Sequence, residues 1–273
     1  MVTALARLAG KRRYYKANCV EALAELRRIN QNIAANQAET ARLRVETEAT
    51  LARRPRCKRW KRGTIKLMAY NKFKKVAQLR EMLGLEDLMD AWLPERLPQS
   101  AASHTLLEAL QDASEEALGT EKAKSEYVIV PVLKELRRNN PNKFSIFSGY
   151  QFDVESKLGL TGYCDFILSA HPKKVEIDAP VFCLVEAKKG EVEEGFAQCG
   201  AEMYAAQLFN ERHNNPQKVI YGCVTSAFSW AFLQLEEKTL RIDPNYVPLT
   251  FTEPERVLAV LQWILDESLA TDA

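Results

Sequence analysis

A series of short apolar runs in the second half of the chain constrains the fold more than any other feature. Their length and apolar character suit strands. We expect strands over residues 144–152, 163–168, 181–185, 219–225, 230–235 and 240–242. Helices are expected over 121–138, where Pro131 introduces a kink or lies near the first turn, over 195–212, and after Pro254. This order predicts an α/β protein with a mixed central sheet flanked by helices.

The N-terminal part of the chain has a different composition. Residues 17–52 contain no Gly or Pro and are rich in good helix formers, so they predict a long helix or a short coiled coil through which the chain forms a homo-oligomer. Residues 64–118 also appear helical in pattern, with a turn at Gly84 and breaks at Pro94 and Pro98. We therefore expect a basic helical extension over 1–63, a helical region over 64–118 and an α/β domain over 119–273.

Charge is distributed unevenly along the 273 residues. The formal net charge is only +2, but residues 1–63 hold 16 Lys and Arg against 5 Glu and no Asp. The remainder of the chain is therefore acidic. A basic arm on an acidic body indicates contact with nucleic acid, although a solvated charged helix explains the same pattern.

The densest part of this basic arm is residues 53–62. Trp60 within it either stacks on a base or packs against protein, and the sequence does not distinguish the two. The predicted nucleic-acid-binding residues are Arg53, Arg54, Arg56, Lys58, Arg59, Trp60, Lys61 and Arg62.

Cysteine usage and hydropathy indicate a cytoplasmic protein. The six cysteines never form a CxxC pair, which argues against a zinc finger or a disulfide framework. No apolar stretch approaches about 18 residues, so we expect no membrane-spanning helix. Arg7 and the basic residues 11–13 interrupt any apolar signal segment.

Two strand ends carry charges that an ordinary core strand would avoid. Asp165 lies within the run at 163–168, and Glu186 and Lys188 follow the run at 181–185. Residues two apart in a strand share a face, so Glu186 and Lys188 project together, and a carboxylate from a neighbouring strand completes a cluster. Because an isolated buried carboxylate is costly, such a cluster favours a hard cation as partner. The alternative is that Asp165 and Glu186 only pair with Lys188 and Lys189.

The ordered set of Asp165 followed by Glu186-Ala187-Lys188 resembles the PD-(D/E)xK nuclease superfamily, whose fold is restriction-endonuclease-like. In that superfamily an upstream helix contributes a further acid, for which Glu126 is the natural candidate. Gln198, in the helix after the third strand, resembles the helix glutamine of some branches. Two positions depart from the pattern: residue 164 is Cys in place of Pro, and Tyr204 does not have the commoner Gln-x3-Tyr spacing.

The resemblance implies a Mg²⁺-dependent (or Mn²⁺-dependent) nuclease that hydrolyses phosphodiester bonds of nucleic acid, with DNA as the favoured substrate. The implied metal ligands are Asp165, Glu186, the Ala187 backbone carbonyl and Glu126. Lys188 would orient or deprotonate the attacking water, or stabilise developing negative charge.

Two other functions are compatible with the same sequence. One is a catalytically inactive nucleic-acid-binding protein on the same fold, and the other is a coiled-coil interaction protein whose α/β domain is a scaffold. The three scattered histidines argue against zinc chemistry, and no Gly-rich phosphate loop is present.

Overall fold

The computed structural model describes residues 69–270. All of them belong to one compact unit that spans Ile65–Ala273. The helix expected over 17–52 and the basic segment 53–62 lie outside the described residues. None of the described helices combines the length and apolar character that a bilayer span requires.

The described residues form an eight-stranded mixed sheet. Its spatial order is β1-β7-β6-β5-β4-β3-β2, and β8 pairs with β6. The strands are β1 (Glu86–Met89), β2 (Ser145–Gln151), β3 (Tyr163–Ser169), β4 (Val181–Ala187), β5 (Val219–Thr225), β6 (Ser229–Glu236), β7 (Thr239–Ile242) and β8 (Val247–Pro248).

Most neighbouring strands pair antiparallel, but β4 with β5 and β1 with β7 pair parallel. Parallel strands need a crossover connection, and helix α6 (Phe196–Arg212) supplies it between β4 and β5. This crossover brings the beginning of α6 beside the carboxyl end of β4. The candidate site forms at that junction.

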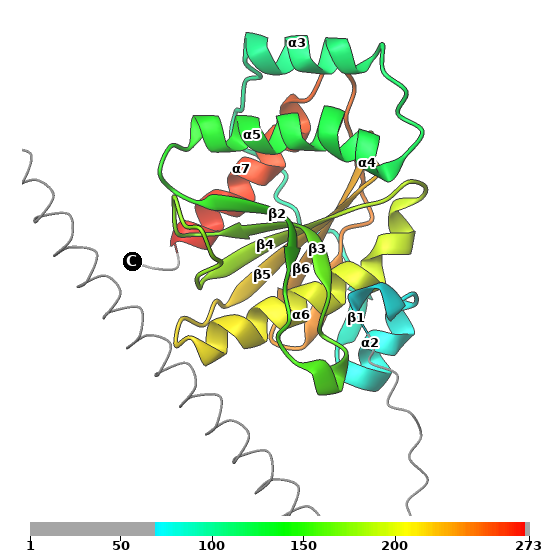
Figure 1. The fold of residues 1–273 in the computed structure, drawn as a ribbon, viewed down its shortest axis with the longest axis vertical. Helices are drawn as coiled ribbons and strands as arrows, with labels where there is room; N and C mark the ends of the chain where they lie inside the picture. Colours follow the sequence, from blue (N-terminus) through cyan, green and yellow to red (C-terminus); the bar gives the residue numbers. More distant parts are fainter. Residues whose placement is uncertain (1–68, 271–273) are drawn as a thin grey trace, which may run out of the picture. The chain divides into compact units, whose positions relative to one another are not determined.

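Helices cover both faces of the sheet (Figure 1). On one face α6 packs on β4 and β5, and α2 packs on α6. On the other face α7 packs on β4 and α5, and α3 packs on α5. Besides α6, the helical elements are η1 (Tyr70–Lys72), α2 (Val76–Leu83), α3 (His104–Ala113), α4 (Glu121–Lys124), η2 (Ser125–Ile129), α5 (Val130–Asn139), η3 (Ser156–Leu158), η4 (Val192–Gly195) and α7 (Glu255–Ala270).

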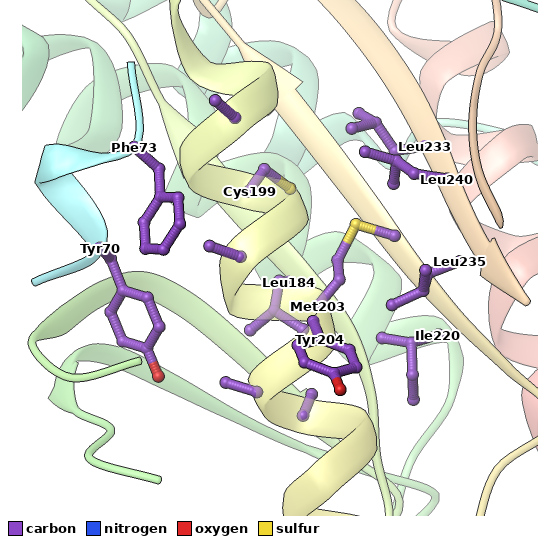
Figure 2. Close-up of a cluster of buried hydrophobic side chains, with 14 of the residues drawn as sticks. Tyr70, Phe73, Leu184, Cys199, Met203, Tyr204, Ile220, Leu233, Leu235 and Leu240 are labelled. Atoms are coloured by element: carbon purple, nitrogen blue, oxygen red, sulfur yellow. The ribbon is translucent and has the colours of Figure 1, made fainter. Parts of the chain in front are cut away.

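Each face of the sheet has its own apolar core. Figure 2 shows the core under α6, where Tyr70 and Phe73 lie on one side of the helix and Leu233 and Leu240 of the sheet lie on the other. Because α6 is covered on both sides, it is buried almost all round, which explains its Ala-rich and Cys-containing sequence. Gly200 permits this close packing, because a Cβ there would lie 2.6 Å from Leu79 Cδ1.

The strands expected from the apolar runs are confirmed, each within about two residues of its predicted ends. The expectation for residues 64–118 is partly wrong. This stretch contains two helices but also β1, and it joins the same sheet as the rest of the unit, so no domain boundary falls at residue 118. β1 is a four-residue edge strand whose side chains are mostly exposed, so it lacks the apolar run from which the other strands are predicted.

The helix expected over 121–138 is present but is not uniformly α-helical. It runs as α4, one π-helical turn (η2) and α5. Val130 donates its N–H to the Ser125 carbonyl, five residues back. Pro131, which has no N–H to donate, follows at the first turn of α5. The π-helical turn therefore accommodates Pro131, at which the sequence predicted a kink or the first turn of a helix.

Asn210 of α6 fastens the helix to the sheet. Its fully buried side chain accepts from Val181 N–H at 2.8 Å and donates to the Val181 carbonyl at 2.7 Å. The first residue of β4 thus has both backbone groups satisfied by one side chain. This contact fixes the far end of α6 relative to β4.

Replacing Asn210 by Leu should destabilise the fold by about 2–4 kcal/mol, because two buried backbone groups lose their partners while side-chain size is kept. Urea denaturation measures the change. The exposed Asn245→Ala variant is the control and should change the free energy of unfolding by no more than about 0.5 kcal/mol. Equal stability of Asn210→Leu and the wild type would contradict this role.

Candidate active site

Two acidic residues meet where β3 and β4 run side by side. The register pairs Phe166 with Val185, so the next residues outward are Asp165 and Glu186, which face each other across the two strands. The Ala187 N–H donates to Asp165 Oδ2 at 2.8 Å. Directly opposed residues of this kind have Cβ atoms about 4.5–5.5 Å apart. The sheet therefore brings together the two carboxylates that the sequence predicted as neighbours.

Lys188 lies immediately after β4 and joins the same cluster. Its backbone N–H donates to the Thr225 carbonyl at 2.8 Å, which extends the β4–β5 pairing by one residue. Its ammonium forms an ion pair with the Glu186 carboxylate. Both partners are largely buried, with 13% of the Lys188 and 2% of the Glu186 side chain exposed. The structure therefore contains the ion pair between Glu186 and Lys188 that the alternative prediction named.

The beginning of α6 completes the cluster. Gln198 Oε1 accepts from Lys188 Nζ at 3.3 Å, and Gln198 Nε2 donates to Glu202 Oε1 at 3.1 Å. A continuous chain of contacts therefore runs from Glu186 through Lys188 and Gln198 to Glu202, which is fully buried. Sequence reasoning missed Glu202, although it lies four residues after Gln198 and so on the same helix face.

Gly195 allows this approach of α6 to Lys188. A Cβ at Gly195 would lie 2.4 Å from Val224 Cγ1 and 3.1 Å from Lys188 Cε. Any larger residue would therefore displace the lysine side chain or the strand beneath it. The glycine that opens the helix thus determines where the ammonium lies.

Burial dominates the electrostatics of the cluster. It raises the pKa of Asp165, which the Ala187 N–H partly opposes. Burial, followed by the charge of Asp165, raises the pKa of Glu186 to about 8 despite the Lys188 ammonium. Burial also raises the pKa of Glu202 well above its ordinary value. For Lys188, burial is the largest single effect and lowers the pKa. The charge and hydrogen bond of Glu186, together with the charges of Glu121 and Asp165, outweigh burial, so the net pKa is raised.

The two acids of the upstream helix have different surroundings. Glu126 forms an ion pair with Lys122 and has 53% of its side chain exposed, and no hydrogen bond or ion pair between described residues connects it to the cluster. The negative charge of Glu121, at the first position of α4, makes a small contribution to raising the pKa of both Glu186 and Lys188, after burial and the closer partners. Lys124 holds this helix in place by donating to the Lys189 carbonyl at 2.7 Å.

Tyr204 lies outside the cluster. Its hydroxyl accepts from Lys238, whose ammonium also lies 3.8 Å from the centroid of the tyrosine ring. The position four residues after Gln198, where the resembled family commonly has tyrosine, is Glu202 here. Its bond to Gln198 gives this position a direct contact with the cluster.

The cluster fits a hard cation with few protein ligands. Glu186 Oε2 is buried and has no hydrogen-bond partner, and Asp165 lies beside it. Within residues 69–270, no group of three or more His, Cys, Asp and Glu side chains is placed to hold a metal ion. Mg²⁺ needs only one or two carboxylates because it keeps several waters, so Asp165 and Glu186 suffice as its side-chain ligands.

No protein-family model matches this sequence, and no curated protein is significantly similar to it.

Glu202→Gln should change how stability depends on pH. The pKa of the Glu202 carboxyl is higher in the folded chain than in the unfolded chain, so stability from this group is complete below pH about 4.5 and falls as pH rises toward the folded pKa. The fall amounts to at most about 1.4 kcal/mol per pH unit. The glutamine keeps the acceptor for Gln198 but does not titrate. The free energy of unfolding of Glu202→Gln should therefore increase relative to that of the wild type as pH rises from 5 to 8.

Thermal or urea unfolding at several pH values measures this difference. Glu211→Gln, an exposed position near the end of the same helix, is the control and should track the wild type throughout. If the free energy of unfolding of Glu202→Gln depended on pH in the same way as that of the wild type, the raised pKa of the Glu202 carboxyl would be contradicted.

Proposed function

We propose that this chain is a Mg²⁺-dependent nuclease that hydrolyses phosphodiester bonds of nucleic acid, with DNA as the favoured substrate. The observation that carries the proposal is the single connected cluster of Asp165, Glu186, Lys188 and Gln198 at the end of β4. The sheet supports it, because β2, β3 and β4 pair antiparallel and β4 pairs parallel with β5 through the α6 crossover. A restriction-endonuclease-like fold has this core.

The residues divide the work by their chemistry. Asp165, Glu186 and the Ala187 carbonyl would hold the metal, which when bound polarises the phosphate and acidifies a water. The Lys188 ammonium donates to the developing negative charge or orients the attacking water. Gln198 accepts from Lys188 and limits where its ammonium lies, and Glu202 holds the Gln198 amide in turn.

Further proposals concern the wider context of this activity. We propose that the basic segment 53–62 contacts phosphates, and that the segment 17–52, whose sequence predicts a helix, joins copies of the chain. A cytoplasmic location agrees with the four cysteines of the described unit, which are free and buried. These thiols are Cys164, Cys183, Cys199 and Cys223.

One observation favours a second candidate function. The Lys188 ammonium forms an ion pair with the Glu186 carboxylate. A chain that only binds nucleic acid through this fold would keep such a pair as a structural element. Metal titration separates the two, because the nuclease must bind Mg²⁺ through Glu186 and the binding protein need not.

The neutral variants Asp165→Asn and Glu186→Gln should each lower Mg²⁺-dependent cleavage by at least about 100-fold, since each removes a metal-ligating charge while preserving shape. Lys188→Ala should lose about 100-fold or more in turnover but keep Mg²⁺ binding. Cleavage of linear, circular and single-stranded substrates, with calorimetry of metal binding, measures both effects.

Lys189→Ala is the matched control, because its exposed side chain neighbours Lys188. This variant should cleave like the wild type. Full activity of folded Asp165→Asn or Glu186→Gln would remove the nuclease function from this cluster, and loss of Mg²⁺ binding in Lys188→Ala would contradict the role given to the lysine.

Glu121→Gln and Glu126→Gln form a second matched pair on one helix. Because the charge of Glu121 acts on Glu186 and Lys188, its neutral variant should lower turnover or shift the metal dependence several-fold. Glu126→Gln, whose carboxylate pairs with Lys122, should stay within about twofold of the wild type. Cleavage rates over a Mg²⁺ titration compare the two variants. A larger loss of activity in Glu126→Gln than in Glu121→Gln would support Glu126, the helix acid predicted from the sequence.

A further inference from the structure

Strand β3 changes course at Asp165. Residues two apart in a strand share a face, so Cys164 should lie on the same side of the sheet as Phe166. Instead, Phe166 packs in the core covered by α7, whereas Cys164 packs in the core under α6 together with Ile167. The alternation of faces is therefore interrupted between Cys164 and Phe166, where Asp165 lies.

Strand β2 shows the same interruption at Gly149. Phe147 and Tyr150 are three residues apart, so a regular strand would place them on opposite faces. Both pack against the core under α6, and their ring centroids are only 5.4 Å apart. Gly149 between them has a φ of +58°, and within the described strands β1–β8 no other residue has a φ in this left-handed region. Gly149 is therefore the residue at which β2 turns over.

The two interruptions lie directly opposite each other. The pairing of β2 with β3 is regular from the start of β2 to Ser148 and again from Tyr150 to its end. Gly149 and Asp165 face each other in the gap between these two paired stretches. Because one residue is left out on each strand, the pairing resumes without a shift in register. The turn in β2 and the turn in β3 are therefore one feature of the sheet.

This turn coincides with the place where the Asp165 side chain reaches β4. The backbone pairing of β3 with β4 ends at Phe166. Because the Lys188 N–H donates to β5, the N–H and C=O groups of the preceding Ala187 face β3. The Ala187 N–H donates to Asp165 Oδ2 at 2.8 Å. The carboxylate thus takes the place of a backbone partner, which holds it beside the end of β4.

The glycine is required by its backbone conformation and not by packing. A Cβ at Gly149 would have no heavy atom within 4 Å, but L-residues rarely adopt a φ of +58°. Strand β2 is an edge strand (Figure 1) and contributes no residue to the candidate active site. An effect of Gly149 on the site must therefore pass through the paired backbone of β3.

We propose that Gly149 is a positioning residue for Asp165: the left-handed turn that it permits in β2 directs the Asp165 carboxylate onto the Ala187 N–H and toward Glu186. A residue that adopts a negative φ here would restore the ordinary alternation of faces, and Asp165 would leave the Ala187 N–H. The consequence for metal binding rests on the proposed function, whereas the placement of Asp165 does not.

Amide hydrogen exchange of the full chain, followed by NMR, tests the placement of Asp165. The quantity measured is the exchange rate of the Ala187 N–H divided by that of the Lys188 N–H, which donates to β5 and corrects for overall stability. Asp165→Ala removes the acceptor and should raise this ratio about tenfold. Gly149→Ala should raise it by a similar factor, and Gly149→Asn by less, because asparagine adopts a left-handed conformation more readily than alanine.

Gly84→Ala and Gly84→Asn are the matched controls. Gly84 follows α2 with a φ of +67°, and a Cβ there would also have no heavy atom within 4 Å. It precedes β1, at the opposite edge of the sheet from β2. These variants impose the same kind of backbone strain, and the exchange ratio should stay within about twofold of the wild type.

The Mg²⁺ dependence of cleavage tests the consequence for the site. Gly149→Ala should need about tenfold more Mg²⁺ for half-maximal cleavage, because a misplaced ligand weakens metal binding. At saturating Mg²⁺ its turnover should approach that of the wild type, because Glu186 and Lys188 keep their positions. Gly84→Ala should match the wild type in both quantities.

The proposal is overturned if Gly149→Ala leaves the exchange ratio at the wild-type value, or if the Gly84 variants raise it as much as the Gly149 variants do. If Gly149→Ala does not fold, the two asparagine variants decide by the same comparison. A raised ratio with an unchanged Mg²⁺ dependence would overturn the link between this placement and metal binding. If Asp165→Asn retains full cleavage, the proposed function fails, and the exchange ratio still tests the placement of Asp165.

Discussion

The burial of two carboxylates side by side at the end of β4 is the constraint on which the rest of the site depends. Asp165 and Glu186 are brought together by the β3–β4 register, and removing them from water is unfavourable. The fold offsets this cost with the Lys188 ammonium and the Ala187 N–H. Neither of these partners contacts Glu186 Oε2, and the Asp165 carboxyl lies beside Glu186.

The architecture around β4 explains how the cluster is kept in place. The parallel β4–β5 pair requires a crossover, and the helix that makes it begins beside Lys188 and ends where Asn210 binds the start of β4. Gly195 at one end and Asn210 at the other therefore fix α6 along the strand. Because of this placement Gln198 reaches Lys188, and Glu202 reaches Gln198. A helix anchored at only one end would leave the ammonium less restricted.

Much of this arrangement is predictable from the sequence, because strands and strand-end charges are local signals. The runs containing Asp165 and Glu186 are apolar enough to identify as strands, and the two-residue spacing of Glu186 and Lys188 places them on one face. The role of Glu121 is not local, because it depends on how α4 docks against the end of β4. The short edge strand β1 is likewise defined only by its pairing with β7.

The most direct measurement of the central claim is the location of a divalent ion in crystals of the full chain soaked with Mn²⁺, whose anomalous scattering identifies it. Our account predicts an anomalous peak between the carboxylates of Asp165 and Glu186, with the Lys188 ammonium moved away from the oxygen it contacts without metal. A peak at this position that disappears in Glu186→Gln crystals would support the account. No peak there, or a peak unchanged by that substitution, would contradict it.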